Sequence, residues 1–109
     1  MTDVQVVLCT FPDLAQARQI GTALVEKQLA ACVNLIPGLE SIYRWEGKVQ
    51  REAEVLAVIK TTGVRLDELK RELLLVHPYE VPEVLALPVG EGSEAYLNWV
   101  GAETRGLAE

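Results

Sequence analysis

The feature that most constrains this chain is a pair of long strand-like segments, residues 31–45 and 49–61, on either side of Glu46-Gly47. Glycine supplies the positive φ that a two-residue hairpin turn requires, so the two segments predict a β-hairpin. With about fourteen residues per arm at ~3.3 Å each, the hairpin would be roughly 45 Å long. A globule of about 100 residues has a radius of gyration near ~13 Å. We therefore predict a hairpin whose tip projects from a compact body.

The tip of this hairpin is rich in apolar and aromatic side chains, at Ile42, Tyr43 and Trp45. Exposed apolar strand ends can pair with another chain. Pro37-Gly38 in the first arm predicts a bulge or bend, and a strong bend would instead fold the tip back onto a monomer. The length of the hairpin favours the projecting tip, so we expect an oligomer.

The remaining segments alternate between strand and helix patterns. An apolar run at residues 4–9 predicts a first strand, and Asp13 followed by Gln16 is a helix-start signal. His77-Pro78 ends a second helix, because the residue before proline avoids helical backbone angles. Apolar residues at helical spacing predict the buried stripes of these two helices, Leu14, Ala17, Ile20 and Leu24 in the first and Leu66, Leu69, Leu73 and Val76 in the second.

The chain closes with a strand at residues 84–89, whose unbroken apolar run predicts burial on both faces, and a short helix capped by Ser93. The order is therefore β-α-β-β-α-β plus a terminal helix, which is the ferredoxin-like α+β pattern with an antiparallel sheet. Right-handed connections would place the third strand between the first two and the fourth on the outer side of the first. We predict that residues 1–109 form a single domain.

Composition excludes several kinds of partner. The net charge of −6 argues against nucleic acid, and no stretch approaches the ~20 apolar residues of a membrane span. Asp3 and Gln5 interrupt the first apolar run before it reaches signal-peptide length. The two cysteines, Cys9 and Cys32, fall two strands apart in the predicted sheet, too far for a disulfide. We expect a cytoplasmic protein with free thiols and no nucleic-acid or membrane partner.

Four segments resemble, in order and spacing, the signature blocks of the CutA divalent-cation-tolerance family. They are Val7-Leu8-Cys9-Thr10, Leu29-Ala30-Ala31-Cys32-Val33-Asn34, Tyr43-Arg44-Trp45-Glu46-Gly47 and His77-Pro78-Tyr79-Glu80-Val81-Pro82-Glu83. The resemblance implies a ferredoxin-like fold in a tight homotrimer that is similar to PII-type signalling trimers. It also implies tolerance to divalent metals and copper binding, with Cu²⁺ or another divalent metal as ligand and no required cofactor.

Four residues are candidate metal ligands: Cys9, His77, Glu80 and Glu83. Thiolate and imidazole suit copper, and Cys9 matches the cysteine implicated in metal binding by the resemblance. The alternatives are that Cys9 is a small buried hydrophobe and that His77 binds backbone carbonyls at the end of its helix. Some family members have a second His just before this one, where this chain has Val76, and that departure weakens the expected copper affinity.

A second candidate function is a PII-like sensor or scaffold, which binds a small anion or a partner protein in a cleft between subunits. The resemblance places Lys60 and the region Tyr43 to Trp45 near such a cleft. Asn34 is unusual within a strand, and we expect its side chain to make a specific hydrogen bond. Cys32 alternates with apolar neighbours and is interpreted as part of the core.

The charged residues of the hairpin have a simpler interpretation. Glu52, Glu54 and Lys60 share one face of the second arm and Arg44 lies on the first, so cross-strand charge pairs are the favoured prediction. The sequence has no Gly-rich phosphate loop and no G-x-S-x-G motif, and we expect no enzymatic activity.

Overall fold

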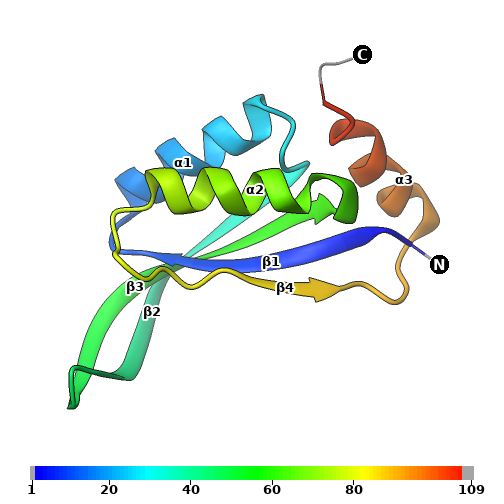
Figure 1. The fold of residues 1–109 in the computed structure, drawn as a ribbon. Helices are drawn as coiled ribbons and strands as arrows, with labels where there is room; N and C mark the ends of the chain where they lie inside the picture. The colour runs from blue at the N-terminus through cyan, green and yellow to red at the C-terminus, as the bar shows by residue number, and fades with distance from the viewer. Residues whose placement is uncertain (1, 107–109) are drawn as a thin grey trace.

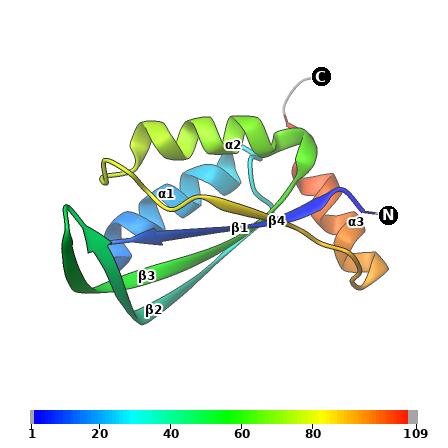
Figure 2. The ribbon, with the colours of Figure 1, turned by 60° about the horizontal axis from the view of Figure 1, so that its bottom comes forward.

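The computed structural model describes residues 2–106 and has the predicted order of elements (Figure 1). The four strands form one antiparallel sheet in the order β2-β3-β1-β4, which confirms the predicted ferredoxin-like arrangement. Helices α1 and α2 lie side by side on one face of the sheet, and α3 lies at one end (Figure 2). The elements are β1 (Val4–Phe11), α1 (Leu14–Glu26), β2 (Cys32–Trp45), β3 (Lys48–Thr62), α2 (Gly63–Val76), β4 (Leu85–Pro88) and α3 (Glu94–Glu103).

Local signals set the helix ends as expected. The Asp13 carboxylate accepts hydrogen bonds from the backbone N–H of Gln16, at 2.8 Å, and from its side-chain amide, at 2.9 Å. His77 is the C-cap of α2, and Ser93 Oγ accepts from the backbone of α3. The other strands differ from the predicted bounds by one residue at one or both ends, whereas β1 continues two residues past residue 9 through Phe11, whose buried ring belongs to the core.

The hairpin has the predicted turn, bulge and projection. Glu46 and Gly47 both have positive φ, 51° and 81°, as a tight two-residue hairpin turn requires. The register shifts between Ile36 and Leu39, and Gly38 within that bulge has a φ of 84°. The molecule measures 45 × 27 × 22 Å, and the hairpin tip stands away from the body in Figure 1. The bulge bends the hairpin without returning the tip to the helical layer.

The core lies between the sheet and helices α1 and α2. Buried residues from both layers form it, with Val7, Ile59, Leu24, Leu69 and Leu73 among the fully buried. Val76 was expected on the buried stripe of α2, and that prediction is wrong, since Val76 is 44% exposed. It is the last residue of the helix, beyond the buried turn that ends at Leu73.

Strand β4 corrects a second expectation. It spans four residues, and all four are exposed in the single chain, so the predicted burial on both faces is wrong. The reason is position, because β4 is an edge strand that pairs only with β1. Leu85 and Leu87 lie opposite Leu8 and Val6, and paired residues point to the same face of a sheet. They therefore project away from the layer that contains buried Val7.

The sheet face opposite α1 and α2, which we call the open face, is mostly apolar. By strand alternation and register its apolar residues are Val6 and Leu8 of β1, Leu56 and Val58 of β3, Ile36 of β2, and Leu85 and Leu87 of β4, and the polar Thr10 and Asn34 also lie on it. Cys32, expected in the core, is only partly buried and shares this face with its pairing partner Lys60. Large exposed apolar surfaces of this kind are typical of interaction sites.

Candidate functional site

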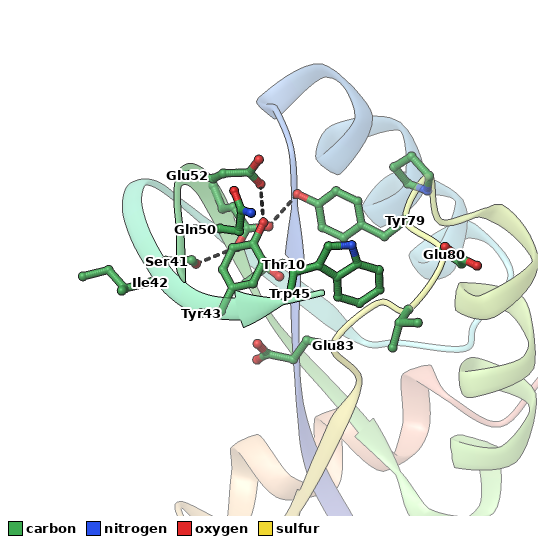
Figure 3. Close-up of a pocket in the computed structure, with 13 residues that line it drawn as sticks. Thr10, Ser41, Ile42, Tyr43, Trp45, Gln50, Glu52, Tyr79, Glu80 and Glu83 are labelled. Carbon is green, nitrogen blue, oxygen red and sulfur yellow. Dashed lines mark hydrogen bonds between the residues drawn. The ribbon is translucent and has the colours of Figure 1, made fainter. Parts of the chain in front are cut away.

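A cleft of about 760 Å³ lies between the outer part of the hairpin and the segment 78–83 that follows α2 (Figure 3). The curved hairpin supplies one wall, and the loop that leads to β4 supplies the other. The lining residues are Thr10, Ser41, Ile42, Tyr43, Trp45, Gln50, Glu52, Glu54, Pro78, Tyr79, Glu80, Val81 and Glu83.

Glu54 is the most deeply placed acid in the cleft and is almost fully buried. Its carboxylate accepts hydrogen bonds from Ser41 Oγ at 2.6 Å and from the Tyr79 hydroxyl at 2.5 Å (Figure 3). Burial, together with the bond to Glu54, raises the pKa of Tyr79 above its usual value, so the phenol remains a donor. The Glu54–Tyr79 bond joins the two walls.

Glu52 is held in a similar way near the mouth, where it accepts a hydrogen bond from the Tyr43 hydroxyl at 2.8 Å. This hydrogen bond also raises the pKa of Tyr43, which keeps its proton at neutral pH. Lys60 donates to Asn34 Oδ1, which gives Asn34 the specific partner that was predicted, and Arg44 donates to the Gly47 carbonyl. The prediction of cross-strand charge pairs is wrong, because the four charged residues of the hairpin hydrogen-bond to neutral hydroxyl, amide and carbonyl groups instead of to one another. These residues are Arg44, Glu52, Glu54 and Lys60.

His77 is fixed by both of its ring nitrogens. Nδ1 accepts from the backbone N–H of Tyr79 at 3.1 Å, so Nε2 carries the proton and donates to the Thr10 carbonyl at 2.7 Å. The ring stacks on Phe11 with centroids 4.7 Å apart. Burial lowers the pKa of His77 below its usual value, so the ring is neutral at neutral pH. It therefore ties the start of the 78–83 segment to the end of β1.

Cys9 lies one residue before Thr10, so Cys9 and His77 are at the same end of the sheet. The thiol is fully buried, and burial, with smaller effects from Glu83 and Glu54, raises its pKa to about 12. Such a group is a protonated thiol at neutral pH, not a thiolate. This environment fits the alternative interpretation of Cys9 as a small buried hydrophobe.

The four candidate metal ligands do not form a coordination set within the single chain. Glu80 and Glu83 line the cleft, whereas Cys9 is sealed in the core and His77 has both nitrogens engaged. Residues 2–106 contain no group of three or more His, Cys, Asp or Glu side chains placed to hold a metal ion. A metal site built from these residues would need a contribution from another subunit, and it stays a prediction.

The candidate cleft residues divide into two pairs. Tyr43 and Trp45 line the cleft, while Asn34 and Lys60 bond to each other on the body side of the bulge, outside the lining. Sequence reasoning did not identify Tyr79 or Ser41 as the partners of Glu54. The available signal was an acidic residue, Glu54, at the point where β3 changes from polar to apolar, because a buried acid needs a donor.

Fold and cleft together define a class: small ferredoxin-like α+β proteins with an extended central hairpin and a cleft beside its tip. Residues 5–103 match the family model described as CutA1 divalent ion tolerance protein, and the chain belongs to this family. Within residues 2–106, no helix is both long enough and apolar enough to span a membrane.

Similar proteins support this assignment in sequence and in structure. The chain is 50% identical over 100 residues to the divalent-cation tolerance protein CutA of Thermus thermophilus, covering 92% of this chain and 97% of that one. It is 46% identical over 106 residues to the human protein CutA, covering 97% of this chain but only 59% of the human one. A solved structure of CutA1 from Oryza sativa has a TM-score of 0.91 at 44% identity, covering 94% of each chain.

Proposed function

We propose that this chain acts in divalent-cation tolerance as a cytoplasmic homotrimer, joined through the hairpin of β2 and β3 and through the open face. The observation that supports assembly is the open face itself, with Ile36, Leu85 and Leu87 exposed in the single chain. Burying apolar surface is worth roughly 25 cal/mol per Å², which favours covering such a face with another subunit. Edge strand β4 also offers backbone groups for strand addition.

Sedimentation measurements test the assembly. At micromolar concentration we expect a species of three times the chain mass, and we expect Trp45→Glu to weaken it more than Trp99→Glu. The two tryptophans are matched in exposure, at 42% and 43%, but only Trp45 lies at the hairpin tip. A charge at the tip would have to be desolvated in the interface. A monomeric parent protein at this concentration would refute the proposal.

We also propose that the assembled protein binds Cu²⁺ or another divalent metal near Cys9 and His77, with Glu80, Glu83 or another subunit completing the site. The support is chemical, since imidazole and a cysteine that loses its proton to the metal are good ligands for copper. In the closed single chain, both nitrogens of His77 are occupied. Binding through this imidazole therefore requires the start of the 78–83 segment to give up a hydrogen bond.

Calorimetric titration with Cu²⁺ tests this site. We expect micromolar binding that is lost in Cys9→Ser and His77→Ala but kept in Cys32→Ser, which changes the other, partly buried thiol. Affinity should fall as the pH drops below the ~6.5 of a free imidazole, because burial lowers the pKa at which His77 gains its competing proton. If Cys9→Ser and His77→Ala bind Cu²⁺ like the parent with the same pH dependence, the site is elsewhere.

A second candidate function is a PII-like sensor or scaffold that binds a small ligand or partner protein in a cleft between subunits, to which the cleft described above would contribute one side. The observation that favours it is the preformed cleft of about 760 Å³, in which Glu52 and Glu54 are already oriented by hydrogen bonds. Preorganised concave sites with aromatic walls and a few fixed polar groups are typical of ligand binding.

A further inference from the structure

The charge of the cleft determines which ligands it can accept. Four glutamates line it, Glu52, Glu54, Glu80 and Glu83, and the lining described within residues 2–106 contains no Lys, Arg or His. A small anion would therefore enter a negative cavity without a counter-charge, which is costly. The lining instead favours a cationic ligand.

The four carboxylates are divided between the two walls. Glu52 and Glu54 belong to β3, whereas Glu80 and Glu83 belong to the 78–83 segment. No three acidic side chains among residues 2–106 are placed to hold a single metal ion. Separated carboxylates suit a ligand with several separated positive charges better than one compact ion.

The aromatic side chains supply a second, independent preference. Tyr43, Trp45 and Tyr79 line the same space, and the face of an aromatic ring attracts ammonium groups, most strongly in tryptophan. Both tyrosine hydroxyls donate to carboxylates, so the two rings become richer in electrons. Their flat faces can also pack against the methylene groups of an organic ligand. An inorganic cation has no such groups and would gain nothing from this apolar contact.

We propose that this cleft binds an aliphatic di- or polyamine. Its ammonium groups would lie at the carboxylates of the opposite walls, and its methylene chain would pack against Trp45 and the two tyrosines. This inference rests on the second candidate function, in which the cleft is a ligand site, and it is independent of metal binding near Cys9.

Spermidine titration tests the proposal. The chain has two tryptophans, so in a Trp99→Phe background the fluorescence comes from Trp45 alone, and sedimentation at each spermidine concentration separates cleft binding from a change in assembly. We expect saturable binding that weakens about tenfold in Glu83→Gln, which removes one charged acceptor from an exposed position. Trp45→Leu, followed by calorimetry at a concentration where sedimentation shows the same oligomer as the parent, should weaken binding severalfold without changing the charge. Glu26→Gln, the same change at an exposed site on α1, should bind like the parent.

Several results would overturn the inference. Equal weakening by Glu26→Gln and Glu83→Gln would mean that spermidine responds only to net charge. Full displacement of spermidine by an equal concentration of Mg²⁺, or unchanged affinity in Trp45→Leu, would remove the role of the methylene chain and rings. An oligomer that binds Cu²⁺ as described above but ignores spermidine would refute the amine site while leaving the metal proposal intact. Absence of any cleft ligand together with loss of Cu²⁺ binding in Cys9→Ser would instead reject the second candidate function.

Discussion

Replacing Leu69 by Ala is expected to lower the free energy of unfolding by about 2–5 kcal/mol. Leu69 is fully buried on α2, within the cluster between the helices and the sheet. The substitution removes apolar atoms from this core and leaves a cavity that the sheet cannot close, because β1 and β3 are held by their pairing. Chemical denaturation gives the measurement.

Leu75 provides the matched control for this prediction. It lies on the same helix but is 76% exposed, so Leu75→Ala should change the free energy of unfolding by less than about 0.5 kcal/mol. Both variants must be compared with the parent at one protein concentration, since the stability of an oligomer depends on concentration. Similar losses in the two variants would contradict the placement of α2 on the sheet.

We expect His77→Ala to cost about 2–4 kcal/mol at pH 8, the second-largest effect. The substitution leaves the Thr10 carbonyl and the Tyr79 N–H without their partner, and an unsatisfied buried polar group costs about 1–3 kcal/mol. It also removes the ring stacked on Phe11. Because the hydrogen bond to Thr10 and the stacking on Phe11 join the start of the 78–83 segment to β1, we expect proteolysis to cleave that segment faster in the variant.

The pH dependence of this cost has a defined sign. Burial lowers the pKa of His77 in the folded state, whereas in the unfolded chain it returns to ~6.5. Between these two pKa values the unfolded state binds more protons, so the parent loses stability as the pH falls below ~6.5. The stability gap between parent and His77→Ala should therefore narrow from pH 8 to pH 5.

A non-titrating variant separates this effect from packing. His77→Gln keeps an N–H donor for Thr10, so it should recover part of the stability while its difference from His77→Ala stays constant with pH. His77 is the only histidine of the chain, which makes the titration easy to attribute. A gap between parent and His77→Ala that is the same at both pH values would show that the ring does not titrate differently on folding.

The parts of the fold that the sequence predicted depend on local chemistry. Asp13 with Gln16, Pro37-Gly38, Glu46-Gly47 and His77-Pro78 each specify a cap, bulge, turn or helix end through neighbouring backbone groups. The strand order followed from the handedness of two crossovers. These predictions were accurate because neither the local signals nor the strand order requires knowing which side chains that are distant in sequence contact one another.

The candidate site was harder to predict because its contacts are long-range. Glu54 and Tyr79 are separated by a whole helix, and nothing in either local sequence identifies the other as its partner. The acids of the hairpin suggested charge pairs, but nearby hydroxyl and amide groups were the partners that strand register and loop position brought within reach. The burial of β4 was misjudged because apolar composition does not distinguish a central strand from an edge strand.

The central position of β1 has a consequence for synthesis of the chain. Its first neighbour, β3, ends at Thr62, and its second, β4, begins at Leu85, so the earliest strand made is the last to be fully paired. At ~5–20 residues per second, roughly 4 to 15 s separate the appearance of Phe11 and Pro88 at the ribosome. During that interval the apolar run from Val6 to Leu8 emerges without its final hydrogen-bonding partner. Until β4 has been made, this side of β1 is therefore an unpaired apolar strand edge, which other chains can bind.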